Sequence, residues 1–152
     1  MSNTILLVED NPMAVELIIS AFNDKETNNS IHMVQSGEEA IDYLFGNDKY
    51  SARNIYPIPS IILLDLKMTG IDGFDVLKKI KNTPVMKRIP IIIFSSSKNN
   101  DDIKKCFDLG ANSYIRKPIS FEDLVDTIET INTYWNTINI FPVNYQDKLS
   151  IF

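Results

Sequence analysis

Short, mostly apolar runs recur along the chain and alternate with longer stretches in which apolar residues return every three or four positions. The short runs occupy positions 4–8, 31–34, 60–66, 91–94 and 111–115. Runs of this length, bounded by proline, glycine or polar residues, are typical of strands that are buried on both faces of a sheet. The pattern therefore predicts five buried strands. The central one carries a carboxylate, Asp65, near its end.

The intervening stretches have the spacing of helices with one buried face, and helices are expected at positions 12–22, 37–45, 74–80, 101–109 and 121–131. Ser36 and Ser120 stand where a side chain can accept a hydrogen bond from the first helical turn, and Gly110 can end the fourth helix. Alternation of five strands with five helices predicts a doubly wound α/β fold with a parallel sheet. A length of 152 residues suits one domain.

Composition excludes several kinds of site and partner. A net charge of −5 argues against a nucleic-acid-binding surface, which usually has clustered Lys and Arg. The single cysteine, Cys106, and the single histidine, His32, cannot form an internal disulfide or a zinc cluster. No apolar segment reaches transmembrane length and the N-terminus lacks a signal-peptide pattern, so we expect a cytoplasmic protein without membrane contact.

Chemically reactive side chains stand at the carboxyl ends of four predicted strands: Glu9 and Asp10, Asp65, Ser95 and Lys117. In a doubly wound sheet these ends share one edge, so the residues can converge. Three neighbouring carboxylates repel one another unless a cation is present, and oxygen ligands suit Mg²⁺ first and Mn²⁺ second. A lysine and a hydroxyl beside them can hold a tetrahedral anion. The set predicts a site that accepts a phosphoryl group on a carboxylate.

Each of these residues also has an ordinary explanation. Asp65 can cap the following turn, Glu9 and Asp10 can be solvated acids at a helix start, Ser95 can belong to a turn, and Lys117 can be a surface cation. Their joint occurrence at four of the five strand ends favours a shared site.

Other classes of protein fit the pattern less well. Glu9 and Asp10 would repel the phosphate of a flavodoxin-like FMN carrier. A nucleotide hydrolase needs a glycine-rich cradle, and the chain has five glycines without a GxxxxGK or GxGxxG motif. A phosphatase with an aspartate nucleophile usually has a second acid two residues on, where Lys67 stands. A DNA-binding regulator would need an output domain, for which the residues after position 133 are expected to be too few.

The motifs at positions 7–11, 63–68, 72–73, 94–96 and 117–118 resemble those of the receiver (CheY-like) domain of two-component response regulators. The resemblance covers about residues 3–133 and implies strand order 2-1-3-4-5. It also implies that a sensor histidine kinase supplies a phosphoryl group to Asp65. Asp10, Asp65 and the backbone carbonyl of Lys67 would bind Mg²⁺, and Glu9 would act through a bound water.

The same resemblance implies how the phosphoryl group is held and detected. Lys117 would pair with the acyl phosphate and Ser95 would donate a hydrogen bond to it. Tyr114 stands at the place of the family's switch aromatic. A cis peptide bond is expected before Pro118.

A narrower resemblance is to stand-alone receivers of the Rcp type, which are associated with phytochromes. They share the long connection at positions 46–59 and an aromatic-rich ending that begins at Tyr134 and Trp135. A phytochrome-type kinase is therefore a possible partner. One departure is Thr69, followed by Gly70, where most receivers have proline four residues after the acceptor. We expect a more mobile loop there.

The chain is predicted to divide into a receiver domain at residues 1–133 and a tail at residues 134–152. The tail is too apolar for a solvated, disordered end. Two interpretations stay open. The tail can fold back over its own domain, or it can complete a homodimer interface formed by the fourth and fifth helices and the fifth strand.

Overall fold

Five parallel strands form a single sheet in the order β2-β1-β3-β4-β5, as the resemblance implies. The structure is a computed structural model that describes residues 3–24 and 29–142. The strands are β1 (Thr4–Val8), β2 (Ser30–Val34), β3 (Ile61–Leu64), β4 (Ile91–Ser95) and β5 (Ser113–Arg116). The predicted parallel sheet is confirmed, and each strand begins and ends within two residues of its predicted position.

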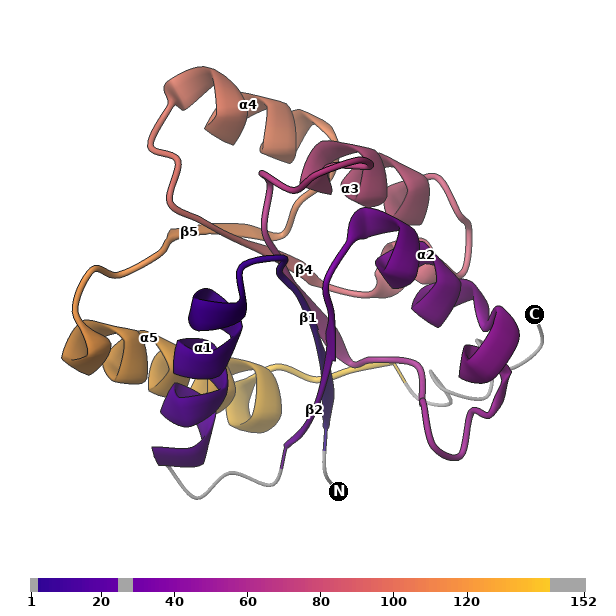
Figure 1. Cartoon of the computed structure of the whole chain (residues 1–152), viewed down its shortest axis with the longest axis horizontal. Coiled ribbons are helices and arrows are strands. Elements are labelled where there is room, and N and C mark those ends of the chain that lie inside the picture. The colour runs from indigo at the N-terminus through magenta and orange to yellow at the C-terminus, as the bar shows by residue number, and fades with distance from the viewer. Residues whose placement is uncertain (1–2, 25–28, 143–152) are drawn as a thin grey trace.

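Helices cover both faces of the sheet, which makes three layers (Figure 1). They are α1 (Pro12–Asp24), α2 (Gly37–Phe45), α3 (Gly73–Lys81), α4 (Asn100–Asp108) and α5 (Phe121–Thr133). α1 and α5 pack together on one face, and α2, α3 and α4 lie on the other. None of the described helices is long and apolar enough to cross a membrane.

Alternate strand residues supply the two cores. Leu6, Ile62 and Ile93 face the core under α2, α3 and α4, whereas Leu7, Leu63 and Ile92 face the core under α1 and α5. All six are buried. Because both faces of the central strands are covered, their sequences are continuous apolar runs.

The long connection at residues 46–59 is folded against α2. The guanidinium of Arg53 donates hydrogen bonds to the carbonyls of Tyr43 (2.7 Å) and Leu44 (2.7 Å) at the end of that helix. The Tyr50 hydroxyl donates to Glu39 Oε1 (2.6 Å) in its first turn. These contacts fix α2, whose first turn faces the functional edge of the sheet.

The described part of the tail folds back on the domain. α5 continues into a π-helical turn, Tyr134–Ile138, and the rings of Trp135 and Phe141 stack 6.4 Å apart against the core under α1 and α5. Asn136 Nδ2 donates to Asn29 Oδ1 (2.9 Å). Residues 134–142 therefore follow the first of the two interpretations, in which the tail folds back over its own domain. The division at residue 133 stays a prediction, because residues 143–152 lie outside the described part.

Candidate functional site

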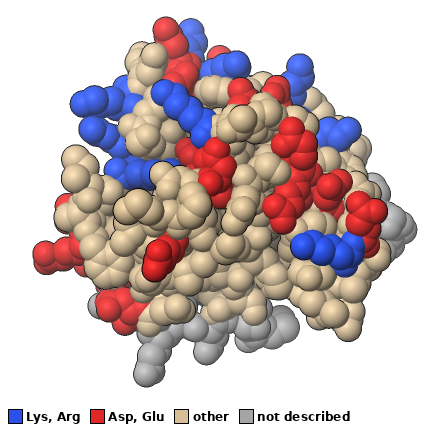
Figure 2. Space-filling model, in the orientation of Figure 1, with Lys and Arg blue, Asp and Glu red and all other residues tan. Residues whose placement is uncertain are grey.

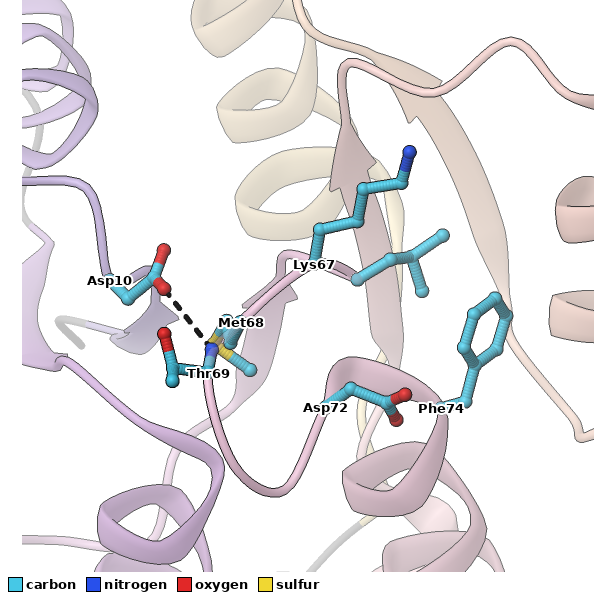
Figure 3. Close-up of a pocket in the computed structure, with 7 residues that line it drawn as sticks. Asp10, Lys67, Met68, Thr69, Asp72 and Phe74 are labelled. Carbon is cyan, nitrogen blue, oxygen red and sulfur yellow. Dashed lines mark hydrogen bonds between the residues drawn. The ribbon is translucent and has the colours of Figure 1, made fainter.

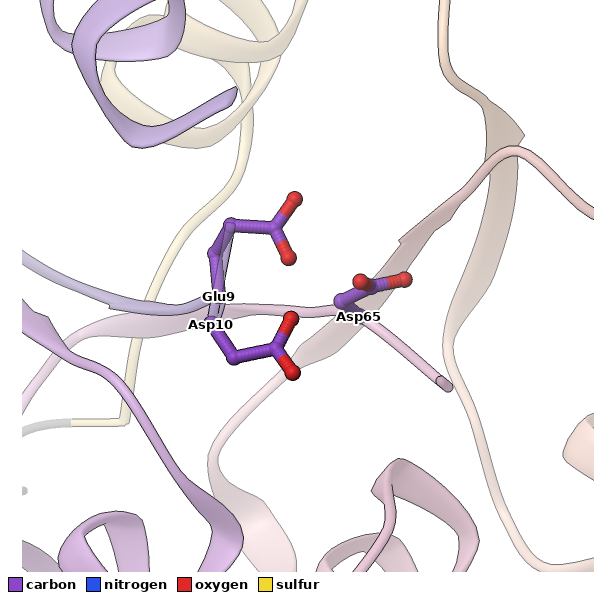
Figure 4. Close-up of side chains that lie close together, drawn as sticks. All are labelled: Glu9, Asp10 and Asp65. Atoms are coloured by element: carbon purple, nitrogen blue, oxygen red, sulfur yellow. The ribbon is translucent and has the colours of Figure 1, made fainter. Parts of the chain in front are cut away.

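Three carboxylates meet where β1 and β3 end side by side. Glu9 and Asp10 follow β1, Asp65 follows β3, and the two strands pair in parallel. One oxygen from each carboxylate lies within 4.8 Å of the others, and Figure 4 shows Glu9 and Asp10 directed toward Asp65. Glu9 and Asp65 are buried, and Asp10 is half-buried. The fold therefore brings these three acids together, as predicted.

Burial governs the electrostatics of Glu9. Loss of hydration, followed by the neighbouring Asp65, raises the pKa of Glu9 to about 7, while Lys117 lowers it. Glu9 Oε1 forms an ion pair with Lys117 Nζ, but the buried Oε2 has no hydrogen-bond partner among the described residues. A buried carboxylate oxygen without a donor is costly unless a cation or a bound water satisfies it.

The donor set fits a hard divalent cation. The described residues contain this one group of three clustered acids, and it contains oxygen ligands only. Such ligands suit Mg²⁺ and Mn²⁺, and the unpartnered oxygen of Glu9 is consistent with a metal-bound water as its missing partner. The expectation of a metal site is therefore supported by the geometry and by the unsatisfied atom.

Asp65 is held at both carboxylate oxygens. Its Oδ1 accepts a hydrogen bond from the Leu66 amide (2.8 Å), and its Oδ2 lies 3.4 Å from Lys117 Nζ. Lys117 follows β5 and reaches across the strand ends to both Asp65 and Glu9. The expected cis bond before Pro118 is wrong, since the described residues contain no cis peptide bond. The trans form is the lower-energy state of an X-Pro bond, and Lys117 enters the site from it.

An open hollow of about 440 Å³ adjoins the Asp10 carboxylate (Figure 3). Its lining residues come from the strand ends and the start of α3: Asp10, Leu66, Lys67, Met68, Thr69, Asp72 and Phe74. The Thr69 amide donates to Asp10 Oδ2 (3.4 Å) across this hollow. Lys67, the residue with the predicted ligand carbonyl, thus shares a cavity with Asp10.

Ser95 and Tyr114 are joined through a residue that the sequence did not single out. Ser95 is buried at the end of β4, and its Oγ accepts a hydrogen bond from the Ser97 amide (3.2 Å). The Ser97 carbonyl accepts from the Tyr114 hydroxyl (2.7 Å), and Ser97 Oγ donates to Asp102 Oδ2 (2.8 Å) in α4. Tyr114 therefore lies inward, against the core under α2, α3 and α4. The sequence signal for Ser97 was its position two residues after Ser95, at the end of a strand, and five residues before an acid, Asp102.

Comparison with known proteins identifies the same family as the sequence motifs. The family model described as the response regulator receiver domain matches residues 5–129. A probable methanogenesis regulatory protein, FilR2 of Methanothrix harundinacea, is 37% identical over 131 residues, which are 86% of this chain and 82% of that protein.

Two solved structures have the same fold at similar length. The phosphorylated cyanobacterial phytochrome response regulator RcpA has a TM-score of 0.87 at 34% identity, over 93% of this chain and 99% of that one. The Mn²⁺-bound form of response regulator Rcp1 has a TM-score of 0.82 at 30% identity, with the same coverage of 93% and 99%.

Proposed function

Because the chain belongs to the response regulator receiver family, whose general function is to accept a phosphoryl group from a histidine kinase on an aspartate, we propose that Asp65 is the acceptor here. The observation that carries this assignment is the placement of Asp65 between two other acids and Lys117 at the sheet edge. Intact-mass measurement after incubation with acetyl phosphate and Mg²⁺ tests it. In this proposal the protein is a signalling domain whose chemistry is limited to its own phosphorylation and dephosphorylation.

The geometry supports a direct transfer to Asp65. A carboxylate oxygen of Asp65 attacks the phosphorus of the kinase phosphohistidine, the N–P bond breaks with its electrons going to the imidazole, and an acyl phosphate forms. The Lys117 ammonium, already 3.4 Å from Asp65 Oδ2, pairs with the phosphoryl oxygens, and the Ser95 hydroxyl donates to them.

Mg²⁺ or Mn²⁺, when bound, supplies the positive charge that offsets the acids and the transferring group. Asp10, Asp65 and the Lys67 carbonyl would hold it, with Glu9 acting through a water. The similarity to the Mn²⁺-bound form of Rcp1 supports the binding of a divalent metal. Mg²⁺ is our first choice because it prefers carboxylate, carbonyl and water oxygens.

Phosphorylation would be detected through Ser95, Ser97 and Tyr114. When the Ser95 hydroxyl turns to the phosphoryl group, it gives up its contact with the Ser97 amide (3.2 Å), and Ser97 is bonded to both α4 and Tyr114. In this proposal a change at the phosphate thus reaches the α4–β5 side of the molecule through one residue.

We expect Lys117→Ala and Ser95→Ala to leave Mg²⁺ binding largely intact and to weaken the response to phosphorylation, because both side chains contact the phosphoryl group and are not metal ligands. The measurement is the change in amide chemical shifts across α4 and β5 on adding acetyl phosphate. Lys78→Ala, which removes an exposed cation from α3, is the matched control and should respond normally. A Ser95→Ala protein with a wild-type response would contradict the role of Ser95.

The proposed upstream partner is a sensor histidine kinase, and the phytochrome response regulator RcpA among the similar structures favours one of phytochrome type. A cytoplasmic location is part of that proposal. Output through protein contacts is proposed in place of nucleic-acid or membrane binding, in keeping with the net charge of −5.

A homodimer through α4, β5 and α5, with exposed side chains of the tail completing the interface, is the second part of the proposal. Figure 2 shows cations mixed with acids over α4, and acids over α5. The cations include Lys104, Lys105 and Arg116, and the acids include Glu122, Asp123 and Asp126. A two-fold axis would set the cations of each subunit against the acids of the other. Phe107 and Phe121 are exposed beside them and would be buried in that interface.

We expect the full chain to sediment as a dimer at micromolar concentration and a chain ending at Thr133 to sediment mostly as a monomer. Removal of the tail also uncovers the core on which Trp135 and Phe141 pack. A second variant, Ile138→Asp with Ile140→Asp, keeps those two aromatics and changes only exposed side chains. If the full chain and both variants all sediment as monomers, with and without phosphorylation, the dimer proposal fails.

A further inference from the structure

The loop that joins β3 to α3, residues 67–72, forms one wall of the hollow beside the phosphoacceptor. Its sequence lacks the expected proline and has Thr69 and Gly70 instead, which predicts mobility. In the structure its path is fixed by contacts from two sides. One is the weak hydrogen bond from the Thr69 amide to Asp10 (3.4 Å), and the other comes from a helix outside the site.

That second contact is made by Glu38, in the first turn of α2. Its Oε1 accepts a hydrogen bond from the Ile71 amide at 3.0 Å. This bond holds the pKa of Glu38 below its usual range, which means that the contact favours the ionised carboxylate. Glu39, the next residue, is occupied elsewhere, with the Gln35 amide (3.1 Å) and the Tyr50 hydroxyl (2.6 Å). Glu38 alone of the pair turns toward the loop.

The backbones of α2 and the loop fit closely at this contact. Gly70 has φ of +79°, and a Cβ added there would stand 2.7 Å from Glu38 Oε1. A Cβ added to Gly37 would stand 2.3 Å from the Ile71 carbonyl oxygen. The second approach is to a backbone atom, so glycine is required at Gly37, whereas at Gly70 the positive φ is what favours glycine. The first turn of α2 is therefore seated directly on the loop, and Glu38 bonds it there.

We infer that Glu38 is a positioning residue of the phosphoacceptor site, which fixes residues 67–72 so that Lys67 and Asp10 line the same hollow. The inference rests on the proposed function, because it assigns Glu38 an effect on the metal and on the transfer to Asp65. Glu38 itself touches neither. Its contribution is to replace, with one hydrogen bond, the stiffness that a proline would give this loop.

The test separates the hydrogen bond from the charge. Glu38→Ala removes both, whereas Glu38→Gln keeps a carbonyl oxygen that can accept from the Ile71 amide. For Glu38→Ala we expect Mg²⁺ affinity, measured by calorimetry, and the initial rate of labelling by acetyl phosphate each to fall about fivefold, the size of one ordinary hydrogen bond. For Glu38→Gln both should stay within about twofold of the wild type. The amide signal of Ile71 should move upfield in the alanine variant only.

Glu16→Ala is the matched control, since Glu16 is an exposed acid in α1 and its loss changes the net charge equally. It should bind Mg²⁺ and react like the wild type. Thermal unfolding confirms that each variant is folded. Wild-type behaviour of Glu38→Ala would overturn the inference, and so would equal losses in the alanine and glutamine variants, since charge alone would then explain them. If the wild type binds Mg²⁺ but takes up no phosphate, the proposed function fails, and the Mg²⁺ titrations still decide the role of Glu38.

Discussion

Replacement of Asp65 with asparagine is expected to abolish labelling by acetyl phosphate in the presence of Mg²⁺. An amide is not a nucleophile toward phosphorus, and the substitution also removes one of the three clustered carboxylates. The wild type should gain the mass of one phosphoryl group, and Asp65→Asn should gain none. The two side chains are nearly equal in size, and the oxygen of the introduced amide can still accept from the Leu66 amide, so the variant should remain folded.

Asp101→Asn makes the same chemical change at an exposed position in the first turn of α4 and should be labelled like the wild type. Peptide mapping of the labelled wild type should place the modification on the peptide that contains Asp65. Labelling that persists in Asp65→Asn would contradict the assignment, and its position on the map would show whether Glu9 or Asp10 is the acceptor.

The architecture could be predicted from the sequence because the central strands are buried on both faces. β1, β3 and β4 are almost wholly apolar and could not be solvent-facing, and the predicted helix at 37–45 matches α2 at both ends. The prediction was two residues off at the start of β5, which begins at Ser113 and not at 111. Asn112 explains the shift, since its side chain accepts from the Ile91 amide (2.9 Å) where a strand residue would use its main chain.

The acids and Lys117 could be predicted because strand ends in a parallel sheet share an edge, so position in the sequence is enough to bring them together. Ser97 and Glu38 could not be predicted in this way. Their roles depend on contacts with Asp102, Tyr114 and Ile71, which the loops determine. No local pattern marks an acid in a first helical turn as the partner of a distant amide.

Gly73→Ala is expected to destabilise the domain and to impair the site together. Gly73 begins α3, and a Cβ there would stand 2.1 Å from the Asp65 carbonyl oxygen and 2.7 Å from Leu66 Cα. Both atoms are backbone, so the end of β3 or the start of α3 must move. Overpacking of this kind costs about 1–3 kcal/mol, more than the gain of less than about 1 kcal/mol from a better helix former. The free energy of unfolding in urea should fall by about 2 kcal/mol, and labelling of Asp65 by acetyl phosphate should slow.

The displaced atoms explain why stability and chemistry should change together. Leu66 bonds to both Asp65 Oδ1 and the Gly73 amide (2.8 and 2.9 Å), so a shift of its backbone reorients the acceptor carboxylate. Ile80→Ala, at a fully buried position of the same helix, should cost at least as much stability, about 2–5 kcal/mol, without touching the site. Under conditions where both variants are folded, Gly73→Ala should be labelled more slowly than Ile80→Ala. Equal labelling rates would mean that the close approach of α3 to β3 serves stability alone.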